Sequence, residues 1–184
     1  MKIAVITPSK PNRTALLEEC KASVTAQTRA ADIHVVKVDY EGIGPAVLRN
    51  QMVMDLSPEY NWLAFLDDDD VFLPRHLELL SIVSGDADVV YSPSQLDLGY
   101  QPFDREVLKE RNFVSVTSLV RRSIFAAVGG FRDLVKYEDW HLWEDISDAG
   151  GRFIFIPEVT WLYRIRPEDT RNWGAELPRT GEIL

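Results

Sequence analysis

The chain has 184 residues, a length that suits a single domain with a substantial core. Its 46% hydrophobic and 27% charged residues are typical of a soluble globular protein, and no apolar run approaches the ~20 residues that span a bilayer. The net charge of −9 argues against a nucleic-acid backbone or an anionic membrane surface as partner. The single cysteine, Cys20, excludes an internal disulfide and indicates a reducing compartment, so we expect a cytoplasmic protein.

Strands and helices alternate through the first half of the chain. Apolar runs rich in β-branched residues predict strands at 2–7, 33–38, 62–66 and 88–91. The helices between them are expected to start after a cap at Asn12, to run from Pro45 to about Leu56, and to follow Pro74 as far as Gly85. Such alternation favours an α/β fold with a mostly parallel sheet.

The second half of the chain is less regular. Residues 92–112 are polar and predict loop or short β pieces, whereas the alternating pattern of 113–120 predicts a strand. A short helix should end at Gly129-Gly130, a longer one should begin at Glu138, and two further strands are expected at 153–156 and 160–165. We therefore expect one domain with a first half at about 1–92, a second half at about 93–167 and an extended tail at 168–184.

Four consecutive carboxylates, Asp67 to Asp70, follow the most apolar of the predicted strands. Adjacent charges held about 5 Å apart at the end of a buried strand repel each other by ~3 kcal/mol per pair at an effective dielectric near 20. A divalent cation would remove that cost, and oxygen ligands suit Mg²⁺ or Mn²⁺. The alternative is a solvated acidic turn. However, apolar residues precede the cluster and residues 71–73 that follow it are also apolar, which a turn on the surface does not need.

Ligands of open α/β sheets bind beyond the carboxyl ends of the strands. Thr7, Asp39 and Asp67 all fall at such ends, which independently predicts a binding site there.

Several blocks of the chain, taken in order, resemble the family 2 glycosyltransferases of the GT-A fold. Among them are an Asp-x-Asp-like motif with one aspartate more than the motif needs and a Glu-Asp-Trp-x-Leu-like helix. The resemblance covers roughly residues 2–167, and the matching blocks are 3–8, 23–28, 49–50, 65–70, 119–131, 137–143 and 163–167. It implies that the first half of the chain, at about 1–92, is a donor half and that the second half, at about 93–167, is an acceptor half.

The resemblance implies an inverting, metal-dependent transfer of one sugar from a nucleotide-diphosphate sugar to a hydroxyl group. Asp69 is then the principal ligand of Mn²⁺ or Mg²⁺, and Asp67 either shares the metal, faces the ribose or holds Arg49. UDP is the expected nucleotide by family frequency alone. The roles of Asp68 and Asp70 stay open. Asp68 is counted with the donor site, and either residue could support the metal ligands without binding the metal. Asp70 could equally face the solvent. The residues implied in donor binding are Thr7, Pro8, Asp39, Arg49, Asp67, Asp68, Arg164 and Arg166.

The resemblance also identifies Asp139 as the general base that takes the proton of the acceptor hydroxyl. Glu138 and Trp140 are the expected acceptor contacts, with first-turn helix chemistry and a core tryptophan as the ordinary alternatives. Arg166 stands where the family often has histidine, and Tyr40 stands where it has a second aspartate after Asp39. A surface salt bridge is the alternative role for Arg164 and Arg166.

Two other functions compete with this interpretation. A nucleotidyltransferase would need a glycine-rich loop after the first strand, and residues 7–11 contain no glycine. A non-catalytic α/β protein could use the acidic cluster to bind a structural cation. The absence of a Gln-x-x-Arg-Trp motif favours single transfer over polymerisation. The acceptor could be a glycan, a lipid-linked sugar, a protein or a small molecule, and its site is either minimal or completed by a second subunit in a homo-oligomer.

Overall fold

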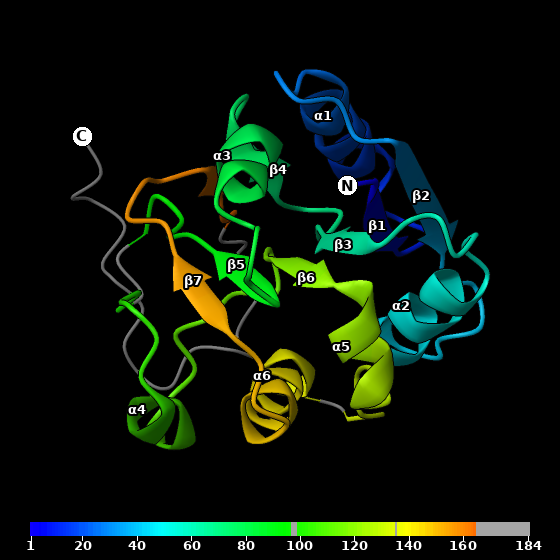
Figure 1. Ribbon diagram of the computed structural model, residues 1–184. Coiled ribbons are helices and arrows are strands. Elements are labelled where there is room, and N and C mark those ends of the chain that lie inside the picture. Colours follow the sequence, from blue (N-terminus) through cyan, green and yellow to red (C-terminus); the bar gives the residue numbers. More distant parts are fainter. Residues whose placement is uncertain (97–98, 135, 165–184) are drawn as a thin grey trace.

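The computed structural model describes residues 1–96, 99–134 and 136–164, and a six-stranded sheet runs through its centre (Figure 1). The strand order is β2-β1-β3-β6-β5-β7. Only the two pairings made by β6 are antiparallel, so the expected mostly parallel sheet is confirmed. The strands are β1 (Ile3–Ser9), β2 (Ile33–Val38), β3 (Trp62–Phe65), β5 (Val89–Tyr91), β6 (Leu119–Arg121) and β7 (Phe153–Phe155).

Six helices cover the two faces of this sheet. Side chains alternate along β1, so that Ile3 and Val5 pack in one apolar cluster and Ala4 and Ile6 in another. The first cluster includes residues of α1 and α3, and the second includes residues of the other four helices. The helices are α1 (Thr14–Thr25), α2 (Pro45–Met54), α3 (His76–Ile82), α4 (Arg105–Glu110), α5 (Arg122–Ala127) and α6 (Glu138–Asp148).

A small antiparallel sheet of β4 (Val71–Phe72) and β8 (Trp161–Leu162) stands beside the main one. It joins the chain just after the acidic cluster to the segment around Trp161 and Leu162. The expected β element of the second half is therefore present, although one of its two strands comes from the first half. None of the helices among the described residues is both long and apolar enough to cross a membrane.

Several predicted boundaries were wrong for local reasons. β1 continues through Pro8 to Ser9, since both residues still lie in register with β2. Asn12 does not cap α1; the cap position belongs to Arg13, which makes no side-chain capping bond. Asp104 caps α4 within the segment expected to be loop, by accepting hydrogen bonds from the amides of Glu106 and Val107.

The strand predicted over residues 113–120 exists only as β6, at residues 119–121. The earlier part of that segment leaves the sheet, and Phe113, Val114, Thr117 and Ser118 are all buried there. The alternation in the sequence does not correspond to one buried and one exposed face of a strand, because adjacent residues of this segment are buried together. The departure from the sheet brings residues 113–116 to the wall of the cavity described next. Of the strand predicted at 160–165, only residues 161–162 form β8, while residues 160, 163 and 164 do not belong to it; residue 165 and the predicted tail at 168–184 lie outside the described residues.

Candidate active site

A cavity of about 680 Å³ lies beyond the carboxyl ends of β1, β2 and β3, and its volume is in the range of small-molecule sites. Most of the predicted residues contribute to its wall. Thr7 does not, because its hydroxyl pairs with Nε2 of His34 at 2.9 Å. Trp140 does not, because its ring N–H donates to the Leu108 carbonyl at 2.6 Å. Arg166 lies outside the described residues. The predicted residues in the wall are Pro8, Asp39, Arg49, Asp67, Asp68, Asp69, Glu138, Asp139 and Arg164.

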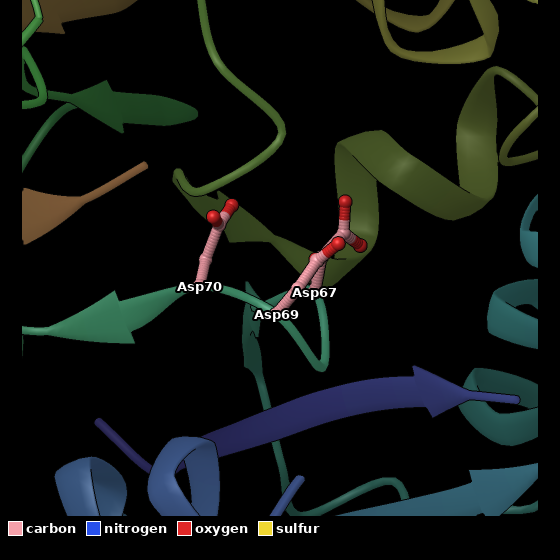
Figure 2. Close-up of side chains that lie close together, drawn as sticks. All are labelled: Asp67, Asp69 and Asp70. Carbon is pink, nitrogen blue, oxygen red and sulfur yellow. The ribbon is translucent and has the colours of Figure 1, made fainter. Parts of the chain in front are cut away.

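Three of the four consecutive aspartates converge at one end of this cavity. Asp67, Asp69 and Asp70 each place a carboxylate oxygen within 4.8 Å of the others, and Figure 2 shows all three side chains leaving the turn on the same side. The amide of Asp70 donates to the carbonyl of Asp67 at 3.0 Å, which closes the turn. The sequence predicted Asp67 and Asp69 as metal ligands; the structure adds Asp70.

Asp70 is only 3% exposed, so the solvent-facing alternative considered for it is wrong. Burial, followed by the charges of Asp67 and Asp69, raises the pKa of its carboxyl well above the usual value. A mutually repelling set of oxygen ligands, in which Asp70 is buried and Asp67 and Asp69 are partly exposed, is the chemistry that suits Mg²⁺ or Mn²⁺. The residues present therefore fit the divalent cation that the sequence implied.

Asp68 points away from this set and is only 1% exposed. Its carboxylate accepts hydrogen bonds from the Ser9 hydroxyl at 2.7 Å, the Lys10 amide at 3.2 Å and Nη1 of Arg13 at 2.5 Å. These three partners belong to the end of β1 and the connection from β1 to α1. The extra aspartate of the motif thus holds that connection against the acidic cluster.

Arg49 links the two ends of the cavity. Its guanidinium is 1% exposed, pairs with Asp67 on one side and reaches Oε1 of Glu138 at 3.1 Å on the other. It also lies 5.2 Å from the centre of the Phe131 ring. Holding Arg49 is one of the roles expected for Asp67. Glu138, expected to contact an acceptor, directs its carboxylate to Arg49 instead.

Asp139 lies in the first turn of α6, partly buried in the cavity wall. Its Oδ2 accepts a hydrogen bond from Nδ2 of Asn112 at 2.9 Å. Burial, and then the charge of Glu138, raises the pKa of Asp139 to about 6, against opposing contributions from the Trp140 amide, Arg49 and Asn112. A carboxylate with such a pKa is ionised at neutral pH and is a stronger base than an ordinary one.

The residue before Glu138 is in a strained backbone conformation. Tyr137 has φ of 64°, the left-handed region, and among the described residues other than glycine it alone has a positive φ. Such a conformation costs about 1 kcal/mol or more and is common where structure is held for function. The turn at Tyr137 starts α6 so that Glu138 and Asp139 both reach the cavity.

Two predicted donor contacts already have partners within the chain. The carboxylate of Asp39 accepts hydrogen bonds from the amides of Gly42, Ile43 and Gly44 at 2.8, 3.0 and 2.9 Å, and these bonds lower its pKa. Asp39 thus shapes the loop 39–44 at the cavity rim.

The side chain of Arg164 donates to the Asp69 carbonyl and to the Glu19 carboxylate. Its Nη2 is buried and has no partner among the described residues.

Of the cavity residues that sequence reasoning missed, three bear directly on the site. Arg13 pairs with Asp68 and Asp69, Asn112 holds Asp139, and Tyr100 lies partly buried in the wall. Burial raises the pKa of Tyr100 well above its usual value, so its hydroxyl stays protonated. Arg13 could have been noticed as a cation just past the first strand, but nothing local marks the other two.

No protein-family model matches the chain, and no curated protein sequence matches it. Solved structures do match. TarS 1–349 from S. aureus, in complex with UDP-GlcNAc, aligns with 90% of this chain and 59% of its own at 14% identity, with a TM-score of 0.74. The mannosyltransferase PcManGT from Pyrobaculum calidifontis, in complex with GDP-Man and Mn²⁺, aligns with 91% of this chain and 58% of its own at 16% identity, with a TM-score of 0.69.

The catalytic domain of Drosophila β1,4-galactosyltransferase 7, in complex with xylobiose, aligns with 95% of this chain and 76% of its own at 22% identity, with a TM-score of 0.67. These similarities establish the fold, which is that of the GT-A glycosyltransferases. The chain spans about 60% of the length of the TarS 1–349 structures it matches.

Proposed function

We propose that this protein is a metal-dependent glycosyltransferase that moves one sugar from a nucleotide-diphosphate sugar to an acceptor hydroxyl with inversion. The observation that carries the proposal is the presence of two different carboxylate sites in one cavity. Asp67, Asp69 and Asp70 form a cluster suited to a cation, and Asp139 is a separate carboxylate with a pKa of about 6. Such a transfer requires one group that neutralises the leaving diphosphate and a second group that takes the proton of the incoming hydroxyl.

At the donor end, Asp67, Asp69 and Asp70 would hold Mn²⁺ or Mg²⁺, which would supply neutralisation of the departing diphosphate. Pro8 and the loop shaped by Asp39 form the part of the wall where we place the nucleotide. Proteins with similar folds bind UDP-GlcNAc in one case and GDP-Man in another, so the fold does not decide which nucleobase the donor carries. UDP is our first choice.

At the acceptor end, Asp139 would take the proton as the acceptor oxygen attacks the anomeric carbon and the bond to the diphosphate breaks. The hydrogen bond from Asn112 fixes the carboxylate, and Asp139 stays ionised above a pH of about 6. Arg49 pairs with both Asp67 and Glu138 and so fixes the position of the acidic cluster relative to the start of α6. Attack from the side of the base, opposite the leaving group, gives inversion.

A thermal-shift panel tests the proposal most directly. The purified chain is heated with UDP, GDP, CDP, the corresponding nucleoside triphosphates and the corresponding nucleotide sugars, each with Mn²⁺ and again with EDTA. Stabilisation by one diphosphate, lost with EDTA, supports the transferase. Stabilisation by Mn²⁺ without any effect of nucleotides would point to a structural cation site, and preference for a triphosphate would point to a nucleotidyltransferase.

A further inference from the structure

Arg13 is the cation closest to the acidic cluster on the side of the β1–α1 connection. Its Nη1 lies 2.5 Å from Oδ1 of Asp68 and 3.3 Å from Oδ2 of Asp69. The side chain is 16% exposed and forms part of the cavity wall. The guanidinium therefore faces the cavity directly beside a proposed metal ligand.

Asp68 holds Arg13 in this position. The carboxylate of Asp68 is buried and is fixed by the Ser9 hydroxyl and the Lys10 amide as well as by Arg13. Among the described residues, both ion pairs of Arg13 run through Nη1, which leaves Nη2 and Nε for a ligand in the cavity. A planar guanidinium held in this way is suited to bidentate contact with phosphate oxygens.

Arg164, one of the predicted donor-binding residues, already has partners for most of its guanidinium. Its Nε and Nη1 already donate to the Asp69 carbonyl and to Glu19, and its Nη2 is buried. We propose that Arg13, positioned by Asp68, is the residue that binds the diphosphate of the donor nucleotide. This inference rests on the proposed function and assigns the diphosphate contact to a residue outside the predicted set.

The position of Arg13 has opposite consequences for the two ligands. Its positive charge favours a diphosphate, but at 3.3 Å from Asp69 it opposes a cation bound to that carboxylate. Removal of the charge should therefore weaken nucleotide binding and leave Mn²⁺ binding equal or tighter. A residue that only supported the shape of the cluster would weaken both when removed.

The test compares Arg13→Gln with Lys21→Gln, which removes the same charge from an exposed position on α1. Lys21 is 44% exposed and pairs with Glu18, away from the described cavity wall. Binding of Mn²⁺ alone is followed by electron paramagnetic resonance, and binding of UDP and GDP at saturating Mn²⁺ by calorimetry. We expect Arg13→Gln to weaken diphosphate binding about 10- to 100-fold, since hydrogen bonds to charged groups are among the stronger ones. Lys21→Gln should leave both constants within about 2-fold of the wild type, as expected for a charge on the solvated surface.

Unchanged diphosphate binding in Arg13→Gln, or a parallel loss of Mn²⁺ and diphosphate binding, would overturn the inference. Arg13→Lys keeps the charge but loses the planar guanidinium, and it should weaken diphosphate binding less than Arg13→Gln. It replaces Arg13→Gln in the test if the melting temperature shows that Arg13→Gln folds poorly. Failure of the wild-type chain to bind any nucleoside diphosphate with Mn²⁺ would refute the proposed function itself. Strong wild-type binding with no effect of either Arg13 substitution would refute the assignment of Arg13 alone.

Discussion

The raised pKa of Asp139, our proposed general base, predicts that its carboxylate destabilises the fold at neutral pH. The pKa moves from 3.8 to about 6 in the folded protein, chiefly through burial. A raised folded pKa means that ionisation costs the folded state more than the unfolded state. The cost is absent below pH ~4, grows between pH ~4 and ~6, and is constant above that window. The change of the pKa from 3.8 to about 6 amounts to about 3 kcal/mol at pH 7.5 and about 1.6 kcal/mol at pH 5.

Asp139→Asn removes this charge with little change of shape, and its amide oxygen can still accept the hydrogen bond from Asn112. In urea unfolding without divalent cations, we expect the variant to be more stable than the wild type by up to about 3 kcal/mol at pH 7.5, with the gain roughly halved at pH 5. Transfer should fall at least about 100-fold, since general-base catalysis supplies a factor of that size or more.

Asp148→Asn is the matched control, because Asp148 ends the same helix at an exposed position beside Arg105. It should change stability by less than about 0.5 kcal/mol at either pH and leave transfer intact. A loss of stability in Asp139→Asn at pH 7.5, or a gain that does not vary with pH, would refute the reasoning about burial. Retained turnover would show that another group is the base.

Three further predictions follow from the same contacts. The rate constant kcat/KM, measured at saturating Mn²⁺, should rise with pH through about 6 and then level off, because Asp139 must be ionised to act; a profile that is flat from pH 5 to 8 would argue against it. Asp69→Ala should weaken both Mn²⁺ and nucleotide binding by about 10-fold or more in calorimetry, in the range seen when metal-site groups are lost, whereas an unchanged Mn²⁺ constant would exclude Asp69 as a ligand. Arg49→Ala should cost about 3–5 kcal/mol in urea unfolding, because it leaves Asp67 and Glu138 without their shared cation in a poorly solvated place; a cost below about 1 kcal/mol would show that water replaces it.

Much of the first half of the fold could be predicted from local patterns. The runs that form β2 and β3 are apolar and β-branched or aromatic, and α2 begins at the proline that was expected to open it. These signals are local because strand alternation and helix starts depend on neighbouring residues. The second half was less predictable. β6 is short and antiparallel, and its approach segment is buried without regular alternation.

The sequence by itself determined that a row of carboxylates follows a buried strand and that Glu138-Asp139 opens a helix. Only the tertiary structure decided which carboxylates act together. The turn at residues 67–70 sends Asp67, Asp69 and Asp70 to one side and Asp68 to the other, where Arg13 meets it across 55 positions of the chain. The pKa of Asp139 likewise depends on burial and on neighbours brought by folding. The sequence gives the types of side chain and their order, but the distances between their charges are set by tertiary packing.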